Sequence, residues 1–180
     1  MKKNRRLFGR FVLCMANVLP TSNSHIKLGQ KKIRSWCARQ ILQECGKSIG
    51  VEKGAKFAFD ISVGDNSALG INCMVGSLTR IGRDVMMGPN VKIYTINHNT
   101  ARLDIPMNQQ GNTAVRPVII GDDVWIGDSV IILPGSRIGK GAILGAGAVI
   151  RGDVPDYAVV IGNPGKVIKY RTETQSKSKG

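Results

Sequence analysis

Aromatic residues, prolines and histidines are scarce in this sequence, and acidic residues are outnumbered by basic ones. With 4 phenylalanines, 3 tyrosines, 2 tryptophans, 7 prolines and 22 glycines in 180 residues, the chain is neither collagen-like nor a low-complexity protein. No apolar run approaches the roughly 18 residues that a membrane-spanning helix requires. Apolar residues still make up 42% of the chain, which is enough to bury the core of one domain.

Cysteine and histidine do not form the pattern of a metal site. The four cysteines contain no Cys-x-x-Cys pair, and the chain has two histidines, His25 and His98. Zinc sites use three or four such ligands, so we expect no bound metal and no disulfide scaffold. We interpret the thiols as buried or unreactive groups of a cytoplasmic protein; they belong to Cys14, Cys37, Cys45 and Cys73.

The net charge of +14 is unevenly distributed along the chain. Residues 1–56 hold 13 Lys or Arg and 2 Asp or Glu, whereas residues 57–180 hold 13 and 10. A basic N-terminal third indicates either an anionic partner at that end of the molecule or a solvated surface. No interleaving of basic and aromatic residues accompanies the charge, so nucleic acid is not expected as a partner.

Residues 1–19 allow two interpretations. Basic residues precede the apolar stretch 11–19, and Ser22 and Ser24 form a small-x-small pair, as in a secretory signal peptide. However, apolar residues recur at 7/8, 11/12, 14/15 and 18/19, which is the spacing of one helical face, and Asn17 interrupts the run. We therefore favour an amphipathic helix that ends at Pro20.

A second amphipathic helix is predicted at about 30–45. Gly46 could take the left-handed conformation just beyond its end. Its apolar face would carry Ile33, Trp36, Cys37, Ile41 and Cys45. The basic residues, among them Arg34, are expected off this face.

From residue 49 onwards the helical spacing gives way to a period of six. The recurring aliphatic residues are Val63, Leu69, Val75, Ile81, Met87 and Ile93, then Ile120, Ile126, Ile132, Ile138, Leu144 and Ile150. Glycine follows them at 64, 70, 76, 82, 88, 121, 127, 139 and 145. The residue four places after all of these except Ile93 is small or β-branched: Ser67, Cys73, Thr79, Val85, Val91, Val124, Val130, Ser136, Ala142, Ala148 and Val154.

This repeat predicts an all-β core built as a parallel β-helix, in which three six-residue units close one triangular coil. The aliphatic residue points inward, and the small residue lies where neighbouring coils crowd together. Glycine is expected at the corner because a side chain would be strained there. The array corresponds to about four regular coils plus partial turns.

The repeat resembles that of the hexapeptide-repeat acyltransferases, whose fold is a left-handed parallel β-helix. The most specific stretches are PVIIGDDVWIG from Pro117, ILPG from Ile132, LGAGAV from Leu144 and IGNPGKVIK from Ile161. These are similar to the sugar O-acetyltransferases, including galactoside, maltose and capsular polysaccharide enzymes. We therefore divide the chain into a basic helical cap (1–48), a β-helix (49–170) with an inserted loop (98–117), and a disordered tail (171–180).

The loop that interrupts the repeat contains His98. From position alone, a structural histidine and a catalytic one are equally good interpretations. The resemblance implies that His98 is the general base that takes the proton of a substrate hydroxyl as it attacks acetyl-CoA directly. A β-helix carbonic anhydrase would need three histidines for its zinc, and this chain has two.

The resemblance also implies where the two substrates bind. Positions matching coenzyme A contacts in the family are Trp125, Asp128, Ala146, Arg151, Gly152, Lys166 and Lys169. Arg151 and Gly152 stand where the family commonly has Thr-Lys, so the basic charge is shifted by one place. Candidate acceptor-binding residues are Asn72, Asn97 and Arg102.

The expected activity is O-acetylation of a saccharide hydroxyl, in capsule, lipopolysaccharide or other glycan modification. The alternatives are an amino-sugar N-acetyltransferase or serine acetyltransferase on the same fold, and a non-enzymatic β-helix that acts in assembly. The resemblance implies a homotrimer with sites between subunits. Residues 1–19 are expected either to cap the β-helix or to contact an anionic membrane surface at the inner face of the membrane.

Overall fold

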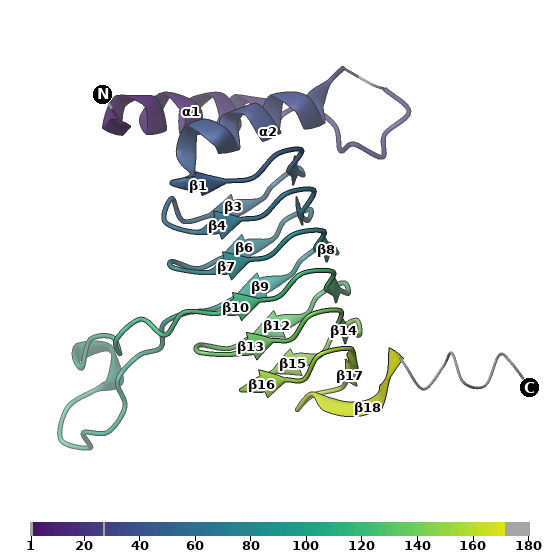
Figure 1. Cartoon of the computed structure of the whole chain (residues 1–180). Helices are drawn as coiled ribbons and strands as arrows, with labels where there is room; N and C mark the ends of the chain where they lie inside the picture. Colours follow the sequence, from purple (N-terminus) through teal and green to yellow (C-terminus); the bar gives the residue numbers. More distant parts are fainter. Residues whose placement is uncertain (1, 27, 172–180) are drawn as a thin grey trace, which may run out of the picture.

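The computed structural model describes residues 2–26 and 28–171. Two helices, α1 (Lys2–Ala16) and α2 (Gln30–Ile41), lie across the N-terminal end of a parallel β-helix (Figure 1). The predicted fold class, a β-helix with short N-terminal helices, is confirmed. Residues 172–180, which make up all but the first residue of the predicted tail, lie outside the described residues.

The coils stack their short strands into three faces. Face 1 consists of β1 (Glu44–Cys45), β4 (Ser62–Val63), β7 (Arg80–Ile81), β10 (Ile119–Ile120), β13 (Arg137–Ile138) and β16 (Asp153–Val154). Face 2 consists of two paired groups in contact with each other: β2 (Gly50–Val51) with β5 (Ala68–Leu69), and β8 (Met86–Met87), β11 (Trp125–Ile126), β14 (Ile143–Leu144), β17 (Ala158–Ile161) and β18 (Lys166–Tyr170). Face 3 consists of β3 (Lys56–Phe57), β6 (Met74–Val75), β9 (Lys92–Ile93), β12 (Ile131–Ile132) and β15 (Val149–Ile150).

All paired strands run parallel except β17 and β18, which are antiparallel. Face 1 has six strands, so the partial turns that the repeat predicts beyond its four regular coils carry strands of their own. The extra strands lie where the six-residue pattern is degenerate. The first of them, β1, begins at Glu44, ahead of the predicted start at 49.

The core is the column of aliphatic residues that the repeat predicts. All twelve are buried, and the most exposed of them is Met87 at 8%. The small residues four places on are buried as well, including the polar Ser67, Thr79 and Ser136. Their hydroxyls bond to the backbone of the corners; Ser67 Oγ, for example, donates to the Gly82 carbonyl at 2.7 Å. The inward assignment of both positions is therefore confirmed.

The reason for the repeated glycine differs from the predicted one. None of the nine repeat glycines has a positive φ; the left-handed position lies two residues further on, at Asn66, Asn72 and Asp84 among others. Asn and Asp tolerate that conformation better than most residues. A Cβ on Gly70 would instead lie 2.0 Å from the Gly88 carbonyl oxygen. Glycine is required because successive coils approach too closely for a side chain.

Both predicted helices exist, but their ends differ from the prediction. α1 ends at Ala16, before Pro20, and α2 ends at Ile41, where Leu42 turns into an extended conformation. Gly46 is not the helix cap: it lies after β1, where a Cβ would meet the backbone N of Asp65 at 2.5 Å. The chain has to leave α2 early because Glu44 already pairs with face 1.

The buried face of α2 is also rotated from the predicted one. Ile33 and Trp36 are 38% and 46% exposed, whereas Arg34, expected on the outer side, is fully buried. Arg34 Nη2 donates to the carbonyls of Ala16, Leu19 and Pro20 at 3.1, 2.7 and 2.8 Å. These carbonyls lie in and just after the last turn of α1, where a cation satisfies acceptors that have no partner within the helix. Burial lowers the pKa of Arg34, and the charge of Glu52 opposes that shift.

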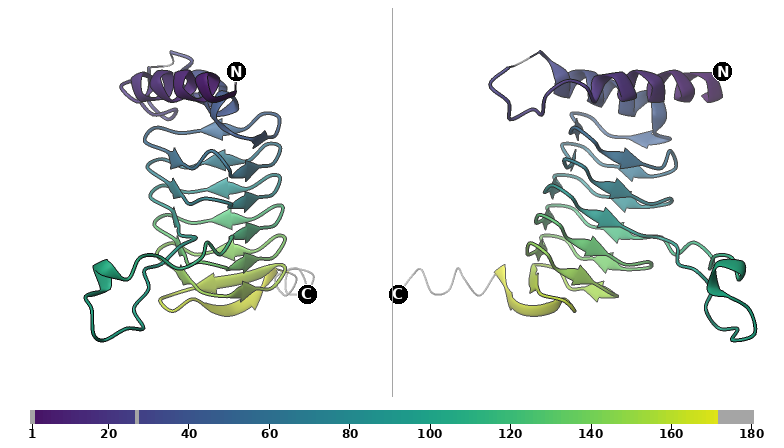
Figure 2. Two further views of the ribbon diagram at one scale, coloured as in Figure 1. Left: turned by 90° about the vertical axis from the view of Figure 1, so that its left-hand side faces the viewer. Right: turned by 180° about the vertical axis from the view of Figure 1, so that it is seen from behind.

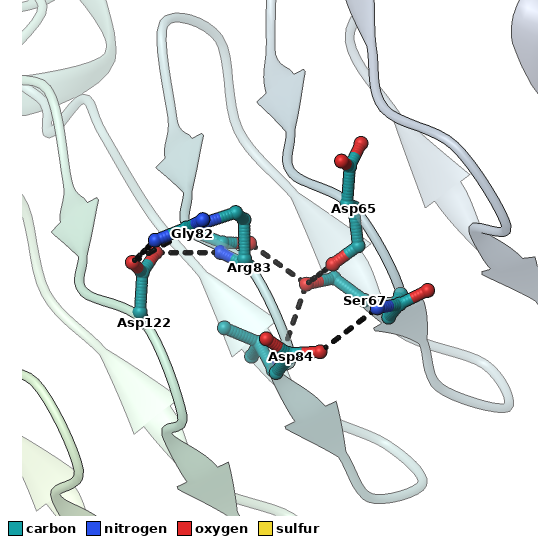
Figure 3. Close-up of polar contacts among 8 residues, drawn as sticks. Asp65, Ser67, Gly82, Arg83, Asp84 and Asp122 are labelled. Carbon is teal, nitrogen blue, oxygen red and sulfur yellow. Dashed lines mark hydrogen bonds and ion pairs between the residues drawn. The ribbon is translucent and has the colours of Figure 1, made fainter.

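Acidic residues order the corner between faces 1 and 2. Asp65, Asp122 and Asp156 accept the backbone N–H of Lys47, Arg83 and Lys140 in the preceding coil, at 2.6, 2.7 and 2.8 Å. Asp122 Oδ2 also accepts from Arg83 Nη2 at 2.9 Å, a contact drawn in Figure 3. The backbone N–H and then the side chain of Arg83 lower the pKa of Asp122. We interpret this cluster as structural, since each carboxylate joins one coil to the next.

Candidate active site

An arm formed by residues 94–117 leaves the β-helix between β9 and β10, at the corner of faces 3 and 1 (Figures 1 and 2). The arm is a two-stranded ribbon near its root rather than a simple loop. Arg116 N–H donates to Thr95 O at 2.7 Å, Thr113 N–H to Asn97 O at 2.8 Å, and Asn99 N–H to Gly111 O at 3.0 Å. These bonds give the first residues of the arm a fixed position.

His98 lies within this ribbon, in an antiparallel bridge with Asn112. Its side chain is exposed, and no hydrogen bond from the described residues holds its imidazole. The neighbouring Asn99 side chain donates to the carbonyls of Gln110 and Asn112 at 3.1 and 3.0 Å. The backbone under His98 is thus fixed while the ring nitrogens face solvent, as a group that meets a substrate requires.

The two other candidate residues of the arm have different environments. Asn97 is exposed, and its N–H donates to Thr113 Oγ1 at 3.1 Å. Arg102 pairs with the carboxylate of Asp104, and that hydrogen-bonded pairing lowers the pKa of Asp104. The Gln110 side chain accepts from Arg102 N–H at 3.0 Å and donates to Arg102 O at 2.8 Å. Arg102 is therefore engaged within the arm.

Most of the predicted coenzyme A positions lie on face 2 and on the corner between faces 2 and 3. Trp125 pairs in register with Met86, and these side chains are 51% and 59% exposed. Asp128 and Ala146 are stacked at the corner, where Gly147 N–H donates to Asp128 O at 2.8 Å. The result is an exposed apolar strip beside a corner of exposed backbone.

The remaining predicted contacts divide between two edges. Lys166 and Lys169 are exposed on β18, which pairs with β17 at the C-terminal end of face 2. Asn72 lies on the same corner as Asp128 but two coils closer to the N-terminal end. Backbone hydrogen bonds link these two coils through the coil between them. Arg151 and Gly152 lie instead at the corner of faces 3 and 1, below the root of the arm. Face 3 separates the two groups within one chain.

A cavity that the sequence did not reveal lies beside the root of the arm. It has a volume of about 220 Å³ and is lined by Gln43, Glu44, Asp60, Ser62, Arg80 and Pro117, among others. Asp60 Oδ2 accepts from Ser77 Oγ, while its buried Oδ1 has no partner among the described residues. Asp60 has no distinctive sequence signal, because it occupies a variable position of a degenerate repeat unit.

The thiols do not form a second chemical centre. All four are free, and Cys37 and Cys73 are buried. Burial raises the pKa of Cys73 to about 12, so this thiol stays protonated at neutral pH. In residues 2–26 and 28–171, no three His, Cys, Asp or Glu side chains are grouped to hold a metal ion.

Two family models match this chain. The model described as "Bacterial transferase hexapeptide (six repeats)" matches residues 117–152, and the one described as "Hexapeptide repeat of succinyl-transferase" matches residues 60–94. A Saccharomyces cerevisiae protein named as a putative acetyltransferase is 37% identical over 147 residues, which cover 79% of this chain and 74% of the relative. The galactoside O-acetyltransferase of Lactococcus lactis is 37% identical over 98 residues, 54% of this chain but only 46% of the relative.

Solved structures of acetyltransferases resemble this chain over most of its length. A maltose O-acetyltransferase from Clostridium difficile is 31% identical, with a TM-score of 0.72, and the match covers 94% of this chain and 87% of that one. A galactoside acetyltransferase in complex with coenzyme A has a TM-score of 0.74 at 24% identity, with coverage of 97% and 84%. At that identity the second likeness supports the fold.

Proposed function

This chain belongs to the hexapeptide-repeat acetyltransferase family, and on that premise we propose that it moves an acetyl group from acetyl-CoA to a saccharide hydroxyl. The glycan of a capsule or lipopolysaccharide is the proposed setting. The observation that carries the proposal is the exposed His98 on a backbone fixed by ribbon hydrogen bonds, in a chain whose face 2 presents the apolar strip and basic end described above. Sugar O-acetyltransferases among its relatives favour a hydroxyl acceptor.

In the proposed mechanism, His98 acts as general base. Its neutral imidazole accepts the proton of the acceptor hydroxyl as that oxygen bonds to the carbonyl carbon of the thioester. Backbone N–H groups at the corner of Asp128 are the proposed donors to the developing oxyanion. When the carbon–sulfur bond breaks, His98 returns the proton to the sulfur of the leaving thiol.

Acetyl-CoA supplies the activated acyl group, and the residues of face 2 fit its parts. Trp125 and Met86 offer an apolar surface beside the reacting end, and the exposed backbone around Ala146 suits the amide-bearing pantetheine arm. Lys166 and Lys169 are exposed cations that could pair with phosphates. Arg151 and Gly152 would have to contribute from another edge.

We propose that the active site is completed by a second copy of the chain. His98 and the residues of face 2 lie on different edges of one β-helix, so an arm of one copy would meet face 2 of the next. A closed ring of such contacts requires a cyclic oligomer, and the triangular cross-section suits three copies. Sedimentation equilibrium should therefore give about three times the 19.4 kDa chain mass. A mass of one chain at assay concentration would contradict the shared site.

The cavity at the root of the arm is the proposed acceptor site. Asp60 lines this cavity, and its buried Oδ1 has no partner among the described residues, so a sugar hydroxyl that enters the cavity could donate to it. Replacing Asp60 with asparagine should raise the acceptor KM by roughly tenfold while changing kcat less, because a hydrogen bond to a charged group is worth about 1.5–3 kcal/mol. Initial-rate kinetics at saturating acetyl-CoA would measure this.

The matched control is Asp84→Asn, which lies in the next coil, at the corner between faces 1 and 2. Asp84 is exposed, accepts from Asn66 Nδ2 at 3.1 Å and has φ 58, which asparagine also tolerates. Its KM for the acceptor should stay at the wild-type value. Equal KM changes in both variants would show that Asp60 does not bind the acceptor.

The proposed activity is tested by incubating the protein with acetyl-CoA and a panel of acceptors, including maltose, galactosides, amino sugars and serine. Thiol release would be followed with a colorimetric thiol reagent, and the product identified by mass spectrometry. We expect release to depend on a neutral saccharide. Turnover only with amino sugars or serine would favour the N- or serine acetyltransferase alternative. Release at the uncatalysed rate throughout would favour an assembly role.

A further inference from the structure

α1 is apolar on two opposite sides. Gly9, Leu13 and Ala16 are buried against α2 and the first coil. On the opposite side, Leu7 and Phe11 stand four residues apart and are 59% and 66% exposed. The same side continues through Met15 to Val18, which is 80% exposed. We call Leu7, Phe8, Phe11, Met15 and Val18 the outer apolar face.

Aromatic residues extend this surface toward α2. Phe8 meets Trp36 of α2 edge to face, with ring centroids 6.4 Å apart. Both side chains are about half exposed, at 57% and 46%. Both views of Figure 2 show the two helices across the end of the β-helix, where they pack against each other. The outer apolar face therefore forms one end of the molecule, remote from β18.

The charged residues of the two helices are all of one sign. Residues 1–43 contain no aspartate or glutamate, and the first acidic residue is Glu44. Lys3 and Arg10, seven residues apart on α1, are exposed, as are Lys32 and Arg39 on α2. A second copy of this face would bring like charges together, whereas an anionic lipid surface would complement them.

We propose that the outer apolar face of α1 docks on an anionic membrane surface, with α1 lying in the plane of the interface. Amphipathic helices with aromatic and aliphatic residues on one side and Lys or Arg beside them bind in this way. Trp36 would lie at the headgroup level, where tryptophan is favoured. No helix of residues 2–26 and 28–171 is long and apolar enough to cross the bilayer.

If the proposed function holds, this orientation restricts which acceptors can reach His98. On face 1, three strand steps separate β1 from β10, next to which the arm emerges; at roughly 4.8 Å per step they span about 14 Å. The helical cap between β1 and the membrane adds about 10 Å, so His98 would then act roughly 25 Å from the membrane surface. A glycan attached to a lipid carrier reaches that height, so we infer that the acceptor is presented on such a carrier.

The docking surface is tested by flotation of the full-length protein with vesicles. Phosphatidylcholine vesicles with and without about one third phosphatidylglycerol would be compared at low and high salt. We expect wild type to float with the anionic vesicles at low salt, with much less protein floating at high salt or with phosphatidylcholine alone. The double variants Leu7→Ser/Phe11→Ser and Lys3→Gln/Arg10→Gln should each lose most of this binding.

The matched control is Leu103→Ser/Met107→Ser. It removes two exposed apolar residues, 98% and 62% accessible, from the tip of the arm, and should float as wild type does. Equal flotation of wild type with both vesicle types, or wild-type flotation of Leu7→Ser/Phe11→Ser, would overturn the proposal. A lower oligomer mass of the latter variant without lipid would also overturn it, in favour of a contact between copies.

The same variants separate this inference from the acetyl transfer itself. Leu7→Ser/Phe11→Ser should acetylate free sugars at the wild-type rate, because the substitutions lie on the cap and outside the proposed site. Normal flotation without acetyl transfer by the wild type would leave the docking surface intact and refute the function. Loss of transfer to free sugars only in the docking variants would show that the cap contributes to the site rather than to the membrane.

Discussion

Replacing His98 with alanine is expected to lower kcat for acetyl transfer by about 10²–10⁴-fold, the usual contribution of a general base. The KM for acetyl-CoA should change little, because the imidazole lies on the arm and the proposed donor contacts lie on face 2. The substitution leaves the ribbon hydrogen bonds of Asn97 and Asn99 in place, so the fold should persist. Initial rates of thiol release, with circular dichroism as a check of folding, would measure the effect.

His25 provides the matched control, since it is the other histidine of the chain and is exposed near the cap. His25→Ala should retain the wild-type kcat. If His98→Ala and wild type release thiol equally fast, above the uncatalysed rate, His98 is not the base. The structural interpretation of this histidine, which its position alone allows, would then be the correct one.

Mixed oligomers extend the same experiment to the shared site. His98→Ala damages only the arm, and Ala146→Trp would obstruct only the corner of face 2, where Ala146 is exposed. If each site joins the arm of one copy to face 2 of the next, random 1:1 mixing by joint refolding restores about one site in four. Two separately inactive variants would then regain activity. A site contained in one chain gives no recovery.

The β-helix was largely predictable from the sequence because its packing repeats locally. Each aliphatic residue stacks on its counterpart one coil away, as Ile120 pairs with Ile81 and Ile138, so one short pattern determines many contacts. The cap was less predictable. Helical periodicity predicts that the charged Arg34 lies on the solvent side of α2. Its burial is explained by the carbonyls at the end of α1, to which it donates, and the sequence pattern does not reveal that contact.

Motifs in the sequence indicate candidate site residues, but they do not predict how those residues are arranged in space. Ala146 and Arg151 are five residues apart in sequence, yet the strand β15 of face 3 lies between them, so they belong to different edges. Motif matching orders residues along the chain and carries no information about which edge each one reaches. Asp60 has no signal in the sequence because the cavity that it lines is formed by segments that are distant in sequence, such as Gln43 and Pro117.

Two glycine substitutions distinguish close coil packing from backbone conformation as the reason for the repeat. In Gly70→Ala the new Cβ would lie 2.0 Å from the Gly88 carbonyl oxygen and 2.8 Å from that of Met87. Both are backbone atoms of the next coil, so they can move only if the strand pairing around β5 and β8 is disturbed. We expect the free energy of unfolding to fall by about 3 kcal/mol or more, at the upper end for overpacked cores.

Gly147→Ala is the matched comparison, because it combines the opposite properties. Gly147 has φ 71, which strains an alanine, but an added Cβ would meet nothing within 4 Å. The expected cost is about 1–2 kcal/mol, that of a left-handed residue with a side chain. Urea unfolding at one chain concentration, followed by circular dichroism, would compare the two. If Gly147→Ala lost more unfolding free energy than Gly70→Ala, a positive φ would be the stronger requirement for glycine in this β-helix. The close approach of neighbouring coils would then be the weaker one.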